Sequence, residues 1–472
     1  MLSAQRIVNA LCVLAGVGLF GACSQTGGRP AAHDAFGRQT PTTSTTRSGS
    51  ARRPAARVKQ PYDSTIRAVV ADLQQFWATQ FAKEYGDRYP PLHTFYAYGP
   101  STNMPVCDGQ RVPYLLLQGN AFYCGDGDDD FIAWDDVGLF PRLDRVYGHF
   151  TIALVLAHEW GHAIQHRAEV DEDTIIMEQQ ADCFAGAWAK HLPTTPAGSA
   201  LSVDPADLDS AVAGLIGFRD PVGLTPATEG SHGTGFDRVR AFQEGYADGV
   251  SRCAAYVDDP PTLVGLAFPD LRSRLFGGDR PFRNVVPEVT ENLDGYWGQF
   301  FDRTTVEPLA GPDRASCIGG ALGAEGVPTD DLSYCPADRT VRWRVDAMRT
   351  IYDDSGDFAV AAAFAEVWAR IYAAHDDGAA VSTYRADCRS GAWARGVYDI
   401  TPRGGEPNSR RYSPVFGDKA IDLQALTLFP GDLDEAVQAL LGSVGGVARG
   451  PNKPFARVDA FRRGFFHGPD AC

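Results

Sequence analysis

The chain has 472 residues, whereas a single domain usually needs roughly 100 to 200, so its length predicts two or three folded units. Hydrophobic residues make up 44% of the chain, charged residues make up 22%, and the formal net charge is -16 at pH 7. This composition is typical of an acidic globular protein and excludes one that binds polyanions through a basic surface. We therefore expect no nucleic-acid partner.

The first 22 residues have the pattern of an export signal. Arg6 precedes a mostly apolar run, residues 7–20, that is shorter than the ~20 residues needed to span a bilayer. The run leads into FGAC, which resembles a bacterial lipobox, although Phe20 stands where leucine is usual. We expect residues 1–22 to be a lipoprotein signal peptide and Cys23 to carry the lipid that anchors the protein to the membrane. The alternative is a signal that is simply cleaved, which would release a secreted protein.

A polar segment, residues 23–60, follows the signal. Thr, Ser, Gly, Pro, Ala and Arg dominate it, and large apolar side chains are almost absent. Such a segment cannot bury enough apolar surface to offset the entropy lost on ordering. We expect a disordered tether that holds the folded part clear of the lipid head groups on the extracytoplasmic side.

Beyond the tether, the spacing of apolar residues predicts a helix-rich α+β fold. Residues 112–134 alternate in polarity and contain Gly and Asp turns, which is typical of strands. The apolar residues of 150–165 and 358–372 fit mostly buried helices, and the later DLDxAV and RVxAF blocks also have helical spacing. The fold class is therefore α+β with helices in the majority.

Six blocks of sequence recur in the same order later in the chain, which indicates two copies of one module. We place the first module at 61–255, a linker at 256–285 and a second module at 286–472. The blocks begin at Leu73, Cys107, Gly148, Ala181, Asp207 and Phe236 in the first copy, and at Leu293, Cys317, Gly356, Ala386, Asp432 and Phe455 in the second.

The cysteines support an oxidising compartment. Without Cys12 in the signal and Cys23 at the lipobox, eight remain, an even number in an exported chain. The repeat excludes most of the possible disulfide pairings, because the cysteines of each module must pair within that module. The predicted disulfides join Cys107 to Cys124, Cys183 to Cys253, Cys317 to Cys335 and Cys388 to Cys472.

The segment His158-Glu159-Trp160-Gly161-His162 has the HExxH pattern. On a helix, this spacing places the two imidazoles on one face with ~6 Å of rise between them, so both can bind one metal ion. Glu159 lies beside them. Burying all three side chains without partners would cost a large desolvation free energy, which favours a metal site over a purely structural cluster.

A catalytic zinc ion needs a third protein ligand and an open fourth position. Glu178 is the expected ligand, and the ExxxD spacing places Asp182 on the same face of a second helix. Asp182 is expected to accept the other N–H of a ligand histidine and so to fix its tautomer and orientation. His166, one turn beyond His162, is the alternative ligand, but a straight helix carries it too far along the axis. We expect one Zn²⁺ per chain.

Three stretches, AHEWGHAIQ, EQQADCFAGAWA and RVRAFQEGY, resemble the putative neutral zinc metallopeptidase family of bacteria, within the thermolysin-like zincins. The resemblance covers most of 61–255. It implies a zincin fold, one catalytic zinc and hydrolysis of peptide bonds in a peptide or protein substrate. By the family's motif, His158, His162 and Glu178 are the zinc ligands and Glu159 is the catalytic carboxylate.

Zinc chemistry predicts how Glu159 acts. Zinc lowers the pKa of its bound water to about 7 and polarises the scissile carbonyl, while Glu159 takes the proton and passes it to the leaving amine. The sequence does not identify the group that stabilises the oxyanion. His232 and Tyr246 are possible donors, but an ordinary structural role is the favoured interpretation of each.

The second module lacks the metal-binding side chains. Glu366, Val367 and Arg370 occupy the positions of the HExxH motif, and Thr383 replaces the glutamate ligand, whereas Asp387 is kept. These side chains cannot hold zinc, so we expect a degenerate, non-catalytic repeat, a pseudoenzyme half.

A cell-surface binding or assembly scaffold with a non-catalytic metal site is the competing function. Closed structural zinc sites are normally rich in cysteine, whereas this motif offers two histidines and a glutamate with a further carboxylate beside them. The sequence therefore favours a peptidase. Since no later apolar segment predicts a second membrane span, the anchor would be lipid alone.

Overall fold

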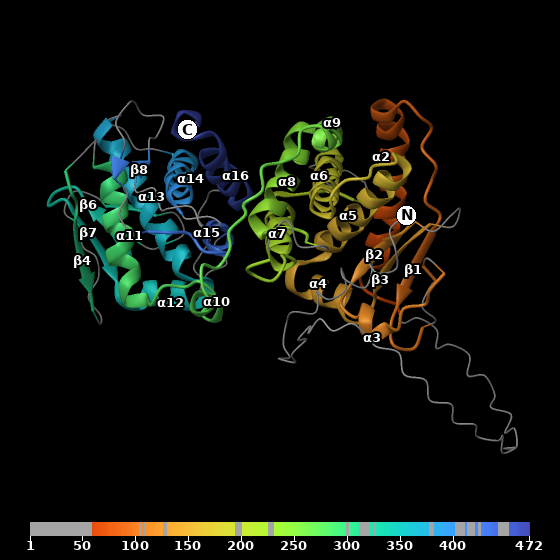
Figure 1. Ribbon diagram of the computed structural model, residues 1–472, viewed down its shortest axis with the longest axis horizontal. Coiled ribbons are helices and arrows are strands. Elements are labelled where there is room, and N and C mark those ends of the chain that lie inside the picture. The colour runs from red at the N-terminus through yellow and green to blue at the C-terminus, as the bar shows by residue number, and fades with distance from the viewer. Residues whose placement is uncertain are drawn as a thin grey trace, which may run out of the picture.

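The protein folds into two helix-rich α+β halves that lie side by side, with their small sheets at opposite ends and helices between them (Figure 1). The predicted signal, Cys23 and almost all of the tether lie outside the described residues. The computed structural model describes residues 59–472 except 103–105, 108, 126–129, 194–200, 225–230, 299–301, 311–316, 318–320, 325–326, 328, 377–381, 402–410, 413–420, 423–425 and 442–452.

The first half builds a three-stranded sheet and packs most of its helices behind it. The strand order is β1-β3-β2, in which β1 and β3 are parallel and β2 and β3 are antiparallel. Every residue of the central strand β3 is buried. The elements are α2 (Asp63–Tyr85), β1 (Thr94–Tyr98), α3 (Tyr114–Leu117), β2 (Ala121–Cys124), β3 (Phe131–Asp135), α4 (Leu139–Tyr147), α5 (His149–Arg167), α6 (Thr174–His191), α7 (Pro205–Gly217), α8 (Gly235–Asp248), α9 (Val250–Ala254) and the short 3-10 helix η1 (Ala255–Val257).

The second half builds a four-stranded sheet of order β4-β7-β6-β5 and a separate pair of short strands, β8 and β9. β4 and β7 are parallel, whereas β7, β6 and β5 pair antiparallel. The elements are α11 (Phe282–Trp297), β4 (Thr305–Leu309), β5 (Leu322–Gly323), β6 (Leu332–Cys335), β7 (Thr340–Arg344), α12 (Val345–Ser355), α13 (Asp357–Asp376), α14 (Thr383–Ile400), β8 (Arg411–Tyr412), β9 (Ile421–Asp422), α15 (Asp432–Leu441), α16 (Pro454–His467) and the 3-10 helix η2 (Pro469–Ala471).

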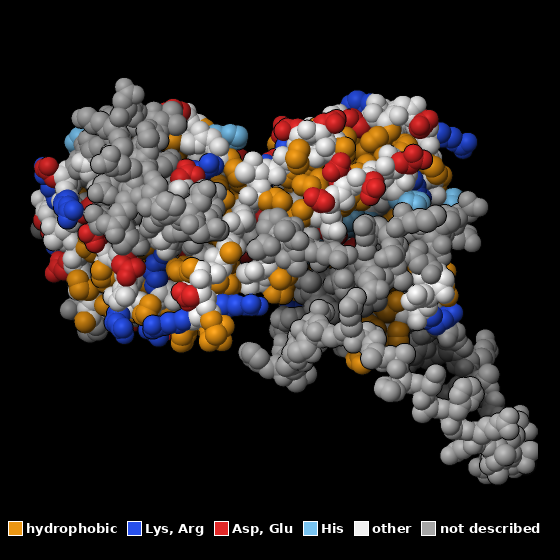
Figure 2. All heavy atoms as spheres, in the orientation of Figure 1, with side chains coloured by type: hydrophobic (Ala, Val, Ile, Leu, Met, Phe, Trp, Pro, Cys, Tyr) orange, Lys and Arg blue, Asp and Glu red, His pale blue; other side chains and the backbone are white. Residues whose placement is uncertain are grey.

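A short helix, α10 (Leu271–Leu275), lies between the halves in the chain. Leu271, Leu275 and Phe276 are exposed there beside two arginines. Figure 2 shows apolar and basic side chains gathered at this lower edge of the second half. Within the described residues, no helix has both the length and the apolar character required to cross a membrane.

The predicted strand region 112–134 is only partly strand. It contains β2 and β3, but the prediction was wrong at Tyr114–Leu117, which form the single helical turn α3. Pro113 directly precedes the helical turn, and its φ is fixed by its ring. At the start of a helix the missing N–H of proline has no cost. The carbonyl of Pro113 accepts a hydrogen bond from Leu116 N at 3.0 Å. The backbone conformation favoured by Pro113 therefore prevails over the strand that the alternating polar and apolar residues predict.

Four disulfides each close within one half, and they are the pairs expected from the repeated order of the cysteines. They join Cys107 to Cys124, Cys183 to Cys253, Cys317 to Cys335 and Cys388 to Cys472.

Helices α6 and α8 cross with their backbones in contact, because glycine stands at the crossing on both helices. A Cβ atom on Gly186 would lie 2.0 Å from Phe242 O, and one on Gly245 would lie 1.8 Å from Cys183 O. Only glycine fits at such distances. The crossing holds α8 close enough to α6 for their polar side chains to meet.

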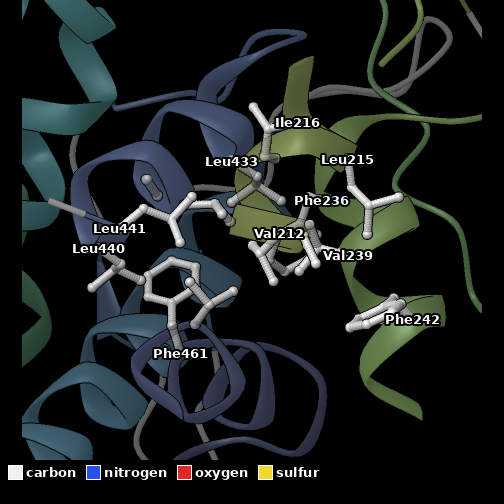
Figure 3. Close-up of a cluster of buried hydrophobic side chains, with 14 of the residues drawn as sticks. Val212, Leu215, Ile216, Phe236, Val239, Phe242, Leu433, Leu440, Leu441 and Phe461 are labelled. Carbon is white, nitrogen blue, oxygen red and sulfur yellow. The ribbon is translucent and has the colours of Figure 1, made fainter. Parts of the chain in front are cut away.

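The two halves meet through α7 and α8 on one side and α15 and α16 on the other. Figure 3 shows the apolar side chains that fill the contact. The ring of Phe236 packs edge to face against Phe461 and Phe465, with centroids 6.3 and 5.2 Å apart. Gln243 Nε2 donates to Phe455 O at 3.0 Å. One continuous hydrophobic core therefore runs through both halves.

Candidate metal centre

Two adjacent helices bring three side chains of the predicted site together. His158 and His162 lie one turn apart on α5, and Glu178 lies near the start of α6. Nε2 of His158 is 3.3 Å from Nε2 of His162, and Glu178 Oε2 lies 3.2 Å from the first nitrogen and 3.5 Å from the second. Two imidazole nitrogens and one carboxylate oxygen thus converge, all within 4.8 Å of one another.

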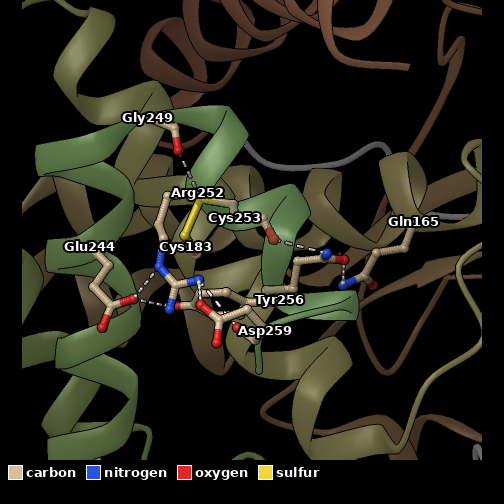
Figure 4. The surroundings of a disulfide bond; sticks show 9 residues. Gln165, Cys183, Glu244, Gly249, Arg252, Cys253, Tyr256 and Asp259 are labelled. Atoms are coloured by element: carbon tan, nitrogen blue, oxygen red, sulfur yellow. Dashed lines mark hydrogen bonds and ion pairs between the residues drawn. A yellow bond between two sulfur atoms is a disulfide. The ribbon is translucent and has the colours of Figure 1, made fainter. Parts of the chain in front are cut away.

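A chain of amide groups fixes which nitrogen of His162 carries the proton. Gln165 Nε2 donates to Met177 O at 2.6 Å and to Gln180 Oε1 at 3.1 Å, so its Oε1 faces His162 Nδ1, 2.8 Å away. Because an amide oxygen only accepts, Nδ1 is the protonated nitrogen of the neutral ring. Gln180 in turn donates to Cys253 O at 3.0 Å, at the disulfide shown in Figure 4. The lone pair of Nε2 is left for a ligand at the point of convergence.

Asp182 fixes His158 in the same way. Its Oδ1 lies 2.8 Å from His158 Nδ1. Arg238 of α8 binds the same carboxylate with two N–H groups, Nε to Oδ2 at 2.7 Å and Nη2 to Oδ1 at 2.9 Å. Burial alone would raise the pKa of Asp182, but Arg238 and His158 lower that pKa to about 2. The carboxylate stays charged and orients the imidazole toward the centre.

The converging atoms have the chemistry of a cation site. Glu178 Oε2 is buried and accepts no hydrogen bond from the part of the chain that the structure describes. Burial would raise the pKa of Glu178, but His232 and His162 hold that pKa well below its usual range. Burial would lower the pKa of His158, yet Asp182 and Glu178 raise it to about 10. The electrostatic field therefore favours positive charge, and two histidines with one glutamate are a known donor set for catalytic zinc.

Glu159 follows the first histidine on α5 and is only 7% exposed. It is not one of the three converging groups. Burial lowers the pKa of His162, but the negative charge of Glu178 and, to a smaller extent, that of Glu159 raise it above its usual value. Its carboxylate therefore acts on the same centre without belonging to the ligand set.

A third histidine, His232, lies at the centre, although the sequence favoured an ordinary structural role for it. Its Nε2 is 3.6 Å from Glu178 Oε2, and its Nδ1 is 3.1 Å from Asp220 Oδ1. Gln179 Nε2 holds the backbone carbonyl of His232 at 2.7 Å. A carboxylate-supported imidazole thus faces the converging atoms from the segment before α8.

The other two candidates from the sequence lie elsewhere. Tyr246 packs its ring against Phe455 of the second half, with centroids 5.2 Å apart. The alternative ligand His166 contacts the hydroxyl of Tyr123 at 3.1 Å through Nδ1, and it is not among the converging groups.

Sequence reasoning missed Arg238, Asp220 and Gln165. For Arg238 a signal was present, because the RVxAF block that contains it recurs later in the chain with an arginine at the same position. Gln165 also had a signal, because it ends the stretch AHEWGHAIQ that resembles the family, whereas Asp220 stands in no recurring block and its role comes from contacts between segments.

The family model described as Putative neutral zinc metallopeptidase matches residues 11–256, just over half of the chain. The chain belongs to this family. The uncharacterized protein YpfJ of Escherichia coli K12 is 24% identical over 204 residues, which is 38% of this chain and 66% of the relative. The uncharacterized protein Rv2575 of Mycobacterium tuberculosis is 28% identical over 154 residues, which is 27% of this chain and 52% of the relative.

A methylated-DNA–protein-cysteine methyltransferase of Rattus norvegicus is also similar, at 26% identity over 141 residues, 29% of this chain and 65% of the relative. Each of the eight cysteines within the described residues lies in a disulfide. The chain spans about half to two thirds of the length of the curated relatives it matches. No solved structure matches it.

We predict one zinc per chain after dialysis, measured by elemental analysis, and loss of that zinc in His162→Ala. His166→Ala is the matched control, because it removes a histidine one turn further along the same helix and should retain the metal. Zinc that survives in His162→Ala but is lost in His166→Ala would contradict the ligand assignment.

Proposed function

We propose that the protein is a zinc-dependent peptidase that hydrolyses peptide bonds in a peptide or protein substrate. The observation that carries the proposal is the convergence of His158, His162 and Glu178, with the buried Glu159 beside them but outside the ligand set. Membership in the family supports zinc as the metal.

Zinc at this site would supply Lewis-acid polarisation of the scissile carbonyl and a water with a lowered pKa. Glu159 takes the proton from the attacking water and delivers it to the leaving nitrogen. His232 acts as the imidazolium, which donates from Nδ1 to Asp220 and from Nε2 to the carbonyl oxygen as negative charge develops there. Asp182 and Gln165 keep the ligand imidazoles in the required tautomer.

We propose that the second half is a degenerate copy of the first. In support, β4, β7 and β6 pair with the same order and directions as β1, β3 and β2. α14 and α16 cross at two glycines as α6 and α8 do: a Cβ on Gly391 would lie 1.9 Å from Phe461 O, and one on Gly464 would lie 1.7 Å from Cys388 O.

The side chains at the equivalent site carry their own positive charge, which supports a copy without zinc. Arg370 Nη2 donates to Glu366 Oε1 at 2.7 Å and to Thr383 Oγ1 at 3.0 Å. Arg457, the equivalent of Arg238, binds both oxygens of Asp387 and also Glu366 Oε2 at 2.8 Å. The guanidinium of Arg370 thus stands among the side chains that replace the metal ligands.

We propose that the peptidase works at the outer face of the membrane, held by a lipid on Cys23 after removal of residues 1–22. The apolar run before Cys23 and the disulfides, which persist in oxidising compartments, support this location. Mass spectrometry of the mature N-terminal peptide should find a lipid adduct on Cys23. An unmodified N-terminus in the culture medium would instead indicate secretion.

Glu159→Gln should keep zinc and lose peptide hydrolysis, because the amide preserves the shape of the side chain but cannot take up the proton. General acid–base catalysis typically contributes about 10²- to 10⁴-fold, so a fall of at least that size in kcat is expected with unchanged metal content. Loss of zinc in this variant would make Glu159 a ligand. Unchanged hydrolysis would mean that a group other than Glu159 takes up the proton, whereas absence of hydrolysis in the wild type would favour the binding scaffold.

His232→Ala should lower kcat by about 10²- to 10³-fold, the usual cost of removing one oxyanion donor, while zinc content and KM change little. Steady-state kinetics with one peptide substrate measures the two parameters separately. Tyr246→Phe is the control, since the ring of Tyr246 packs against Phe455 in the contact between the halves, and its kcat should match that of the wild type.

A further inference from the structure

The structure describes the two ends of the connection between α7 and α8: residues 218–224, which carry Asp220, and residues 231–234, which carry its partner His232. The Asp220 carboxylate joins the two ends: Oδ2 accepts from Ser231 Oγ at 2.8 Å, from His232 N at 2.7 Å and from Gly233 N at 3.0 Å. The position of the imidazole therefore depends on where these two ends are held.

A single side chain of the second half holds both ends. Asp434, in the first turn of α15 and 2% exposed, accepts from Phe236 N at 2.7 Å through Oδ1 and pairs with Arg219 Nε at 3.3 Å through Oδ2. Arg219 directly precedes Asp220 in the chain. At the other end, a Cβ on Gly235 would lie 3.2 Å from Asp434 Oδ1, so glycine permits the close approach.

The bond to Phe236 N also satisfies an unpaired donor at the start of α8. The first N–H groups of a helix have no partner within it, and negative charge is favoured there. Thr234 caps the same helix through Asp237 N. Asp434 therefore supplies from the second half a charge that fixes the start of α8 three residues beyond His232.

The second half receives the reciprocal contact. Asp209 of α7 accepts from Phe455 N at 2.8 Å, at the start of α16. Asp209 and Asp434 occupy the same position in the two DLDxAV blocks. The two bonds are alike in geometry but hold different helices, because Asp434 binds the start of α8, close to His232, whereas Asp209 binds the start of α16.

We propose that Asp434 is a positioning residue for His232, so that the non-catalytic half completes the catalytic centre of the first half. The inference rests on the proposed peptidase function and gives the second half a role within it. Asp220 and Asp434 line one pocket between the halves.

Asp434→Asn tests the proposal, with Asp209→Asn as the matched control. The asparagine keeps the shape and an acceptor but loses the charge that binds Arg219. We expect kcat to fall about tenfold in Asp434→Asn, since small misplacements of a reacting group are costly, with KM and zinc content unchanged. Asp209→Asn should keep the wild-type kcat. Equal effects of the two substitutions, or no effect of Asp434→Asn, would overturn the proposal.

A double-variant cycle separates positioning from general loss of structure. In the His232→Ala background, Asp434→Asn should cause no further fall in kcat, because the group it positions is gone. A further tenfold fall there would show that Asp434 acts on something other than His232. If Asp434→Asn does not fold, Arg219→Gln removes the same ion pair from the other side and should give the same kinetic result.

Hydrogen exchange of the zinc-loaded protein decides the proposal even if no substrate is cleaved. The amides of His232, Gly233 and Phe236 should exchange at least about tenfold faster in Asp434→Asn than in Asp209→Asn. Inactive wild-type protein that nevertheless shows this difference would refute the peptidase function but keep the positioning. Equal exchange in the two variants would refute the positioning itself.

Discussion

The buried carboxylate of Asp182 is shared between a ligand histidine and an arginine, and the arrangement of the site depends on this sharing. His158 and Arg238 approach it from two helices, α5 and α8, while Asp182 itself lies on α6. A buried charge is tolerated only when it is paired and hydrogen-bonded, so the three helices must hold one another at fixed distances. The glycines at the crossing of α6 and α8 make that distance possible.

Under the proposed duplication, the second half meets the same electrostatic requirement with different side chains. Asp387 keeps its arginine, Arg457, and two further groups, Glu366 and Arg370, pair with each other where the first half gathers ligands. Replacing a metal with a guanidinium preserves positive charge among buried carboxylates. Loss of the metal in this half therefore need not have destabilised its core.

Local periodicity explains which parts of the site could be predicted from the sequence. The HExxH and ExxxD spacings place side chains on one face of a helix, and the structure has His158, His162, Glu178 and Asp182 where that spacing requires. The disulfide pairs followed from the order of the repeated blocks. Both patterns depend on residues that are close in the chain or repeated in it.

The remaining features depend on tertiary contacts that spacing does not encode. His232 reaches the centre because its backbone carbonyl is held by Gln179 of α6, and no periodicity encodes such a contact. Gln165 gains its role from Gln180 on another helix. The strand prediction for 112–134 failed at Tyr114–Leu117 for the opposite reason, because Pro113 sets the local backbone conformation against the polarity pattern.

The reciprocal bonds of Asp209 and Asp434 give the contact between the halves the character of a two-fold symmetric dimer interface in which both partners belong to one chain. Because the two halves are covalently connected, each meets the other at an effective concentration, which reaches the millimolar range for short flexible linkers. Such an interface does not need the affinity that would hold two separate molecules together. Changes in the sequence of the second half are then limited mainly by the face that it presents to the first half, and less by its interior.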